Sequence, residues 1–177
     1  MSGRGDNKNN NSEIVSNLSV TIPEERVKII NKEVIENLKN MFNININKQN
    51  NIIEISGNSL EILKVKNIIL AIGRGFSPEK AYYLANEEYI LEMVSISNFS
   101  AARQKIIRSR IIGTHGKIRE KIEEATNCFI SVYGKTISII GKWNEIQNAK
   151  RIIEMIINGA KHTTILKILN TMKKERL

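Results

Sequence analysis

The chain has 177 residues, of which 41% are hydrophobic and 25% charged, values typical of one ordinary soluble domain or two small ones. This composition excludes wholesale disorder, a collagen-like rod and a protein with several membrane spans. One cysteine, Cys128, and two histidines, His115 and His162, exclude an internal disulfide and a cysteine metal cluster, so we expect no metal and no cofactor. Without a stretch of about 20 apolar residues or an apolar leader, we expect a cytoplasmic protein.

The positive charge of the chain is concentrated in its second half. There are 27 Lys and Arg against 18 Asp and Glu, which gives a net charge of +9. Residues 1–88 hold 11 basic and 11 acidic side chains, whereas residues 89–177 hold 16 and 7. We interpret the second half as a region that meets a polyanion. The alternative is that its lysines only line solvated helix faces.

The N-terminal segment, residues 1–16, is polar and rich in asparagine, so we expect a disordered arm there. A first domain is expected over residues 17–87. Ser77 and Pro78 are typical of a helix start. The expected elements of this domain are a strand over Leu18–Ile22, a helix from Pro23 to about Asn31, a helix over Lys32–Phe42, strands at Ile44–Ile46 and Ile52–Ile55, and helices over Leu60–Ile72 and Glu79–Ala85.

A second domain is expected over residues 88–177. Its basic amphipathic helix, Ser100–Ile112, is expected to turn Ala102, Ile106 and Ile107 inward. Trp143 starts the apolar stripe of a later helix and is expected in the core. The expected elements are a strand over Tyr89–Ser97, the helix Ser100–Ile112, a helix over Lys117–Thr126, strands at Cys128–Tyr133 and Ile137–Ile139 ended by Gly141, a helix over Trp143–Ile157 capped by Gly159, and a helix over His162–Lys174.

The two domains repeat each other at an offset of 84 residues. Apolar positions coincide along both copies, as in Leu38 with Ile122 and Ile53 with Ile137, and two glycine pairs coincide as well. A repeat this long indicates two copies of one small domain rather than a solenoid.

The segment Ile111-Ile112-Gly113-Thr114-His115-Gly116 carries the functional signal. A Gly-x-x-Gly loop between two helices lets the backbone approach a ligand closely and turns N–H groups toward an anion. Flanked by basic helices and followed by strand, turn, strand and long helix, it is the pattern of a KH domain, whose loop clamps about four single-stranded nucleotides. We therefore expect an α+β protein of two tandem type I KH domains, each a three-stranded sheet packed on helices with an extra helix after it.

The candidate RNA-binding residues lie on the loop, its flanking helices and the neighbouring strand turn. Ile112 is either core or groove floor, Tyr133 either stacks on a base or only packs, and the two arginines before the loop are either solvated or in contact. His115 is interpreted as a loop-tip residue rather than a metal ligand. The full set is Arg108, Arg110, Ile112, Gly113, Thr114, His115, Gly116, Lys117, Arg119, Ile130, Tyr133 and Lys135.

The first copy has no such loop. At the offset of 84 its loop positions are Ile29, Ile30, Asn31 and Lys32, without a glycine. We expect it to have lost most RNA affinity and to pack on the second domain or to bind a protein.

Three strings resemble the partner-of-Nob-one, or Dim-two, family of KH ribosome-assembly factors. They are the runs Ala71–Ala81, Ile130–Gly141 and Asn158–Thr164, the last with Lys161 where the family has proline. The resemblance, over residues 18–174, implies binding near the 3′ end of small-subunit rRNA and a role in pre-rRNA maturation with a PIN-domain endonuclease. It also links an archaeal relative to the alpha subunit of translation initiation factor two. The short N-terminal segment and the Ile- and Asn-rich usage favour an archaeal version.

The function expected from the sequence is a non-catalytic, RNA-binding ribosome assembly factor that holds single-stranded rRNA in the second domain. The first rival is a protein adaptor in which both copies dock proteins and RNA contact is incidental. An enzyme is the weaker rival, because the sequence has no paired His–Cys or His–Asp spacing, no Walker loop and no metal cluster.

Overall fold

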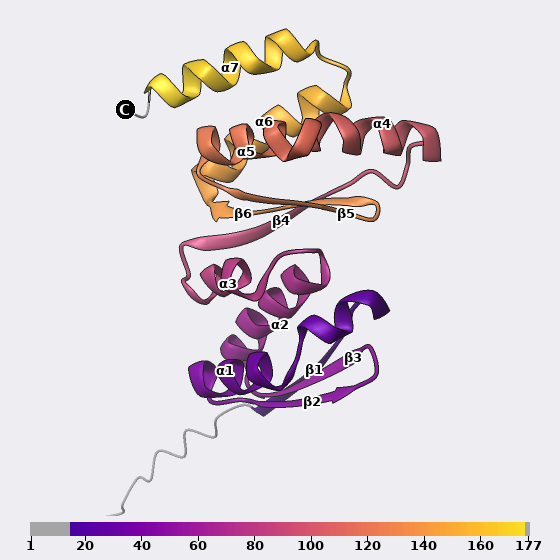
Figure 1. The fold of residues 1–177 in the computed structure, drawn as a ribbon. Helices are drawn as coiled ribbons and strands as arrows, with labels where there is room; N and C mark the ends of the chain where they lie inside the picture. The colour runs from indigo at the N-terminus through magenta and orange to yellow at the C-terminus, as the bar shows by residue number, and fades with distance from the viewer. Residues whose placement is uncertain (1–14, 176–177) are drawn as a thin grey trace, which may run out of the picture.

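The computed structural model describes residues 15–175, which form two α+β halves (Figure 1). Most of the expected arm, residues 1–16, lies outside this range, and residues 15 and 16 belong to the first strand rather than to an arm. The elements of the first half are β1 (Val15–Thr21), the 3₁₀ helix η1 (Glu24–Ile29), α1 (Lys32–Phe42), β2 (Asn45–Gln49), β3 (Ile52–Asn58), α2 (Ser59–Gly73), α3 (Pro78–Ala81) and the 3₁₀ helix η2 (Tyr82–Ala85).

The second half repeats this plan, with a longer helical segment between its first strand and its second. Among the described residues, no helix is long and apolar enough to cross a membrane. The elements of the second half are β4 (Tyr89–Ser95), α4 (Ala101–Ile112), the 3₁₀ turn η3 (Thr114–Gly116), α5 (Lys117–Thr126), β5 (Phe129–Tyr133), β6 (Thr136–Lys142), α6 (Trp143–Ile157) and α7 (His162–Glu175).

Each half contains one antiparallel three-stranded sheet, in the order β1-β3-β2 and β4-β6-β5. Corresponding elements from β2 onward are offset by 84 residues, but β1 and β4 are offset by only 74. The first half is thus ten residues shorter between its first strand and α1. This shortening explains why the helix expected from Pro23 is only the 3₁₀ helix η1, which stands where the second half has α4.

Both sheets bury isoleucines against helices, but the second sheet is covered on its two faces. On β6, Ile137 and Ile139 are fully buried in the core of the second half, while Ile140 is fully buried in the core of the first half. Alternate residues of a strand point to opposite faces. The sheet of the second half therefore lies between its own helices and the helices at the end of the first half, as Figure 1 shows for α3.

Polar and aromatic contacts join the two halves at this covered face. The Ser131 hydroxyl donates to the Arg74 carbonyl at 2.8 Å, and the Tyr133 hydroxyl donates to the Glu25 carboxylate. The rings of Tyr83 and Phe129 meet edge to face with centroids 4.9 Å apart. The β5 strand of the second half is thus anchored by backbone and side-chain groups of the first half.

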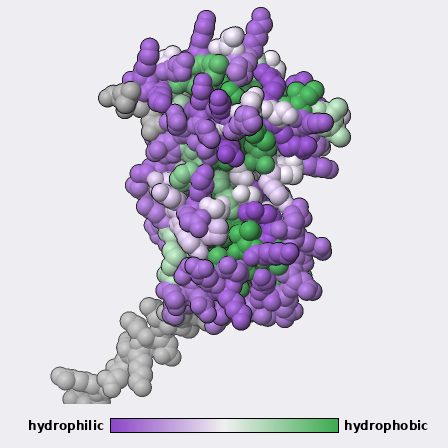
Figure 2. Space-filling model, viewed as in Figure 1, coloured by the Kyte–Doolittle hydropathy of each residue, from purple (hydrophilic) through white to green (hydrophobic). Residues whose placement is uncertain are grey.

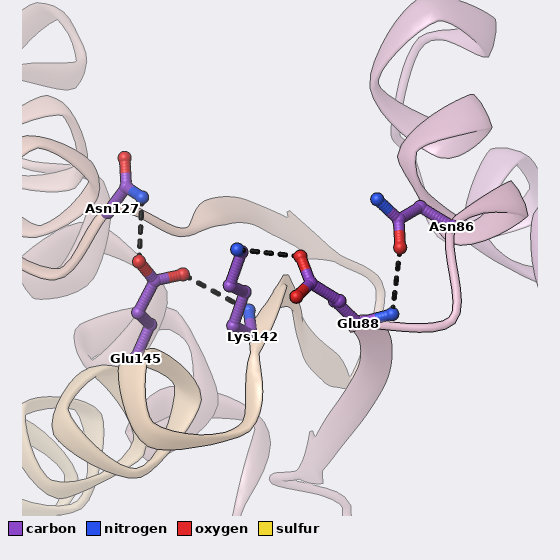
Figure 3. Close-up of polar contacts among 5 residues, drawn as sticks. All are labelled: Asn86, Glu88, Asn127, Lys142 and Glu145. Carbon is purple, nitrogen blue, oxygen red and sulfur yellow. Dashed lines mark hydrogen bonds and ion pairs between the residues drawn. The ribbon is translucent and has the colours of Figure 1, made fainter.

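A short polar chain ties the connection between the halves to the start of α6 (Figure 3). Lys142 Nζ lies 2.7 Å from a Glu88 carboxylate oxygen, and the Glu88 N–H donates to Asn86 at 2.9 Å. Glu145 accepts from the Lys142 N–H at 3.1 Å and from the Asn127 amide at 2.7 Å. A carboxylate that reaches back to the helix start satisfies a free backbone donor there.

Two expected core positions are wrong. Ala102 is exposed and Ile106 is 52% exposed, whereas Ile107 is buried as expected, together with Gln104 and Ile111. The Gln104 amide donates to the Phe99 carbonyl at 2.7 Å, which satisfies that group in a buried position.

Trp143, also expected in the core, is 63% exposed at the first position of α6. The apolar stripe of α6 begins at Ile146 instead. In Figure 2, hydrophilic residues cover most of the visible face of both halves, with hydrophobic residues gathered in small patches.

Candidate nucleic-acid interface

Two glycines shape the loop between α4 and α5. Gly113 has φ +71° and ψ 179°, a conformation open essentially to glycine alone, and its N–H still donates to Ser109 at 2.9 Å. A Cβ on Gly113 would lie 2.9 Å from the Ile118 nitrogen. Gly116, at φ +79°, begins α5 in the left-handed region. Both glycines are therefore needed to reverse the chain between the two helices.

The accessible tip of the loop is Thr114 and His115, which are both exposed. Gly113 is half-buried and keeps some surface. Gly116 is buried, and a Cβ on it would lie 3.5 Å from an Arg119 guanidinium nitrogen. The expectation that bare backbone is accessible at both glycines is therefore wrong for Gly116. Its role is to set the turn, and the surface is offered by its neighbours.

Arg110 is committed to the fold rather than to a ligand. Its guanidinium donates to the Ile156 carbonyl at 3.0 Å and also to the Ala160 carbonyl. These carbonyls lie at the C-terminal end of α6, where backbone acceptors lack helical partners and a cation is favoured. The expectation that Arg110 contacts RNA is thus not supported by its position.

Arg108 lies on a different face of α4 and donates to the Gly134 carbonyl at 3.0 Å. This bond holds the β5–β6 turn, which contains Lys135, against α4. The side chains of Lys117 and Lys135 are exposed, and among the described residues neither side chain makes a hydrogen bond or ion pair. Arg119 is half-buried, with its Nε buried and unpartnered within the same part of the chain. Free positive charge therefore follows the loop at Lys117, and the turn held against α4 carries more of it at Lys135.

The strand side of the loop is less open than the sequence predicts. Ile130 is 3% exposed, so its side chain has almost no surface to offer a base, and its N–H donates to Glu123 at 2.7 Å. Ile112 is half-buried. Glu123, which sequence reasoning missed, also lies 3.8 Å from Lys80 Nζ. Nothing in the spacing of Glu123 signals this role, since it depends on how α5 packs beside β5.

Tyr133 is half-buried, and its ring bridges toward the first half. Its hydroxyl bonds to Glu25, and this hydrogen bond lowers the pKa of the Glu25 carboxyl and raises the pKa of Tyr133. Of the two alternatives for this residue, the structure favours a packing role.

On the other side of the loop, α7 and α5 enclose a hollow of about 360 Å³. Thr114 and Lys117 line it together with two residues that sequence reasoning missed, Lys121 and His162. Their juxtaposition depends on the packing of α7 on α5, for which the sequence gives no signal. Among the described residues, no group of three or more His, Cys, Asp or Glu side chains could hold a metal ion.

The corresponding region of the first half is closed. Ile30 is fully buried, and the Asn31 side chain caps α1 by accepting from the Val34 N–H at 2.9 Å. Lys48 Nζ donates to the carbonyls of Val27 and Ile30, at 3.1 and 2.7 Å. The backbone that would face a ligand is thus bonded internally.

Residues 90–174 match a family model for the second KH domain of partner-of-Nob-one proteins. The model describes a eukaryotic-type KH domain, also called KH-domain type I. The crystal structure of Dim2p from Pyrococcus horikoshii is 33% identical over 88% of this chain and 99% of that chain, with a TM-score of 0.81. The chain belongs to the archaeal Dim2 family of KH-domain proteins.

Two further relatives are a second archaeal Dim2p chain and a KH domain-containing protein. A chain in the crystal structure of the a/eIF2alpha–aDim2p–rRNA complex from P. horikoshii is 32% identical, covers 93% of this chain and 97% of its own length, and has a TM-score of 0.84. A KH domain-containing protein from Methanocaldococcus jannaschii is 38% identical over 118 residues, or 66% of this chain. The match spans about half, 52%, of that relative.

Proposed function

We propose that this protein is a ribosome assembly factor that binds single-stranded rRNA near the 3′ end of the small subunit and acts in maturation of that end. In this proposal residues 17–87 and 88–177 are tandem type I KH domains, and the second holds the RNA. The observation that carries it is the exposed tip, Thr114 and His115, raised between two helices with unpaired lysines on its flanks. The rRNA in the complex of the P. horikoshii relative supports the choice of ligand.

The charge distribution supports the same half as the RNA-binding one. Residues 89–177 carry 16 basic and 7 acidic side chains. Each phosphate neutralised on a single strand releases counterions and contributes about 0.7 to the slope of log affinity against log salt. Lys117, Lys135 and Arg108 supply this attraction, and the half-buried Ile112 gives a base an apolar edge to lie against.

The loop is tested by the double change Thr114→Asp and His115→Asp. Both side chains are exposed, so the fold should be retained while two carboxylates face the phosphates. Filter binding of an oligonucleotide from the 3′ end of small-subunit rRNA should show a loss of at least about tenfold, since like charges at an interface cost several kcal/mol. The matched control is Asn37→Asp with Asn40→Asp, which adds the same charge on the exposed face of α1.

The control should bind like the natural protein. Unchanged affinity in the loop variant would reject the loop as the contact. An equal loss in both variants would show that net charge alone governs binding and would reject a defined site.

A second candidate is a protein adaptor that docks a PIN-domain endonuclease or the alpha subunit of translation initiation factor two. The observation that favours it is the closed first half, together with a/eIF2alpha in the complex of the P. horikoshii relative. After RNase treatment, the adaptor is supported if the natural protein captures either purified partner and the loop variant captures it as well. The adaptor is excluded if neither partner is captured by either protein.

A further inference from the structure

The loop has a second accessible side, which faces α7. On α4, Arg108 and Ile112 share the face toward the β5–β6 turn. Ser109 lies about 100° around the helix from Arg108 and lines the hollow between α5 and α7. Thr114 at the loop tip lines this hollow too. A strand that lies across the tip can therefore continue into the hollow without leaving the protein surface.

The hollow is lined by basic side chains. The side chains of Lys117 and Lys121 are exposed, and within residues 15–175 neither side chain forms a hydrogen bond or an ion pair. His162 faces them from the first turn of α7. The neighbouring carboxylate of Glu124 is already paired with Lys173 Nζ at 2.8 Å.

The apolar and positively charged lining of the hollow suits a ribose and its phosphate rather than a cation. Ile118 and Leu166 give an apolar floor, on which a ribose can lie. Arg110 contributes its positive charge from the back, although its donors are used by the end of α6. The described residues that line the hollow come from helices and the loop, and a contact to phosphate there carries no sequence information.

We propose that this hollow, built by Lys117, Lys121 and His162, is a seat for a backbone phosphate of the same single-stranded RNA, one step beyond the loop. The proposal rests on the proposed function and extends it. The RNA site is longer than the loop clamp alone, and its extension is non-specific. The seat exists because α7 packs on α5, so the last helix of the chain becomes part of the RNA interface.

The test compares Lys121→Gln with Lys167→Gln, a change of the same charge on exposed α7 outside the hollow. Binding is measured for a strand of about four nucleotides, which the loop alone can clamp, and for one of about twelve. Lys121→Gln should weaken the longer strand about two- to fivefold, as expected for one exposed ion pair, and lower its salt slope by about 0.7. The shorter strand and the Lys167→Gln variant should be unaffected.

Other outcomes separate the two proposals. If the natural protein binds both strands and Lys121→Gln behaves like Lys167→Gln, the seat is rejected while RNA binding stands. If the natural protein binds neither strand, both proposals fail. Titration with inorganic phosphate, followed at the amides of Lys121 and His162, adds a further arm. Phosphate binding there with unchanged RNA affinity in Lys121→Gln would mark an anion site unrelated to RNA and overturn the seat.

Discussion

Gly113 and Gly134 both have positive φ, +71° and +57°, but their surroundings differ. A Cβ on Gly113 would overlap the Ile118 side chain and lie 2.9 Å from its backbone nitrogen, whereas a Cβ on Gly134 would meet no atom within 4 Å. The loop glycine is therefore required by packing as well as by backbone conformation, and the turn glycine by conformation alone.

This difference predicts unequal effects of two alanine substitutions. Gly113→Ala should lower the free energy of unfolding by about 1–3 kcal/mol through backbone strain, with a further loss of similar size from packing. Gly134→Ala should lower the free energy of unfolding by only about 1–2 kcal/mol, because of its left-handed conformation. Chemical denaturation followed by circular dichroism measures both. Equal losses would contradict the claim that Ile118 packs against bare backbone at Gly113.

At this residue scale, the sequence identified the loop because glycine spacing and basic neighbours are local signals. It could not separate Arg108 from Arg110, since the partner carbonyls of Arg110 lie about 46–50 residues away at the end of α6. For the same reason the sequence predicts an RNA contact at Ile130, although this side chain is 3% exposed.

At the scale of the element, α4 is held against the end of α6 by two arginines. Arg103 donates to the Ile157 carbonyl at 2.7 Å, and Arg110 donates to Ile156 and Ala160. The basic character of α4 is thus partly structural, because cations stabilise a helix C-terminus.

Arg110→Gln should therefore destabilise the fold, whereas Lys105→Gln on the exposed face of the same helix should not. A hydrogen bond from a charged group contributes about 1.5–3 kcal/mol to stability, and because the half-buried Arg110 keeps part of its solvation, a total loss in that range is expected for Arg110→Gln. Urea unfolding of both variants measures it. A lower RNA affinity in Arg110→Gln at unchanged stability would instead assign Arg110 to the RNA.

The boundaries of most elements could be predicted from periodicity, as with α5 and α6, whose observed ranges are those expected. The inward face of α4 could not. Apolar residues lie on two sides of this helix, and the buried side includes the polar Gln104, whose amide finds its acceptor in the preceding turn.

At the scale of the whole molecule, the offset of 84 residues is kept by every element from β2 to α2, and the ten missing residues remove the loop from the first half. The sequence predicts that the first half either packs on the second domain or binds a protein, but it could not predict that the contact covers the outer face of the second sheet. That contact depends on Gly75 at φ +101°, where the chain passes Ser131 and Tyr133.

Gly75→Ala should weaken the contact between the halves, because a Cβ there would overlap the Ser131 hydroxyl and lie 3.3 Å from Tyr133 Cβ. Gly159→Ala is the matched control, at φ +91° with no atom within 4 Å. In calorimetry we expect one transition for the natural protein and the control, and two separated transitions for Gly75→Ala. A single transition in all three would show that this contact does not couple the halves.

The central claim, that the loop of the second half holds single-stranded RNA, is tested most directly by following the backbone amides of the full chain during titration with a 3′-end rRNA strand. The account predicts the largest changes at residues 113–117 and at the β5–β6 turn, with little change on the sheet of the first half. Changes confined to the first half, with the loop amides unmoved at saturation, would contradict it.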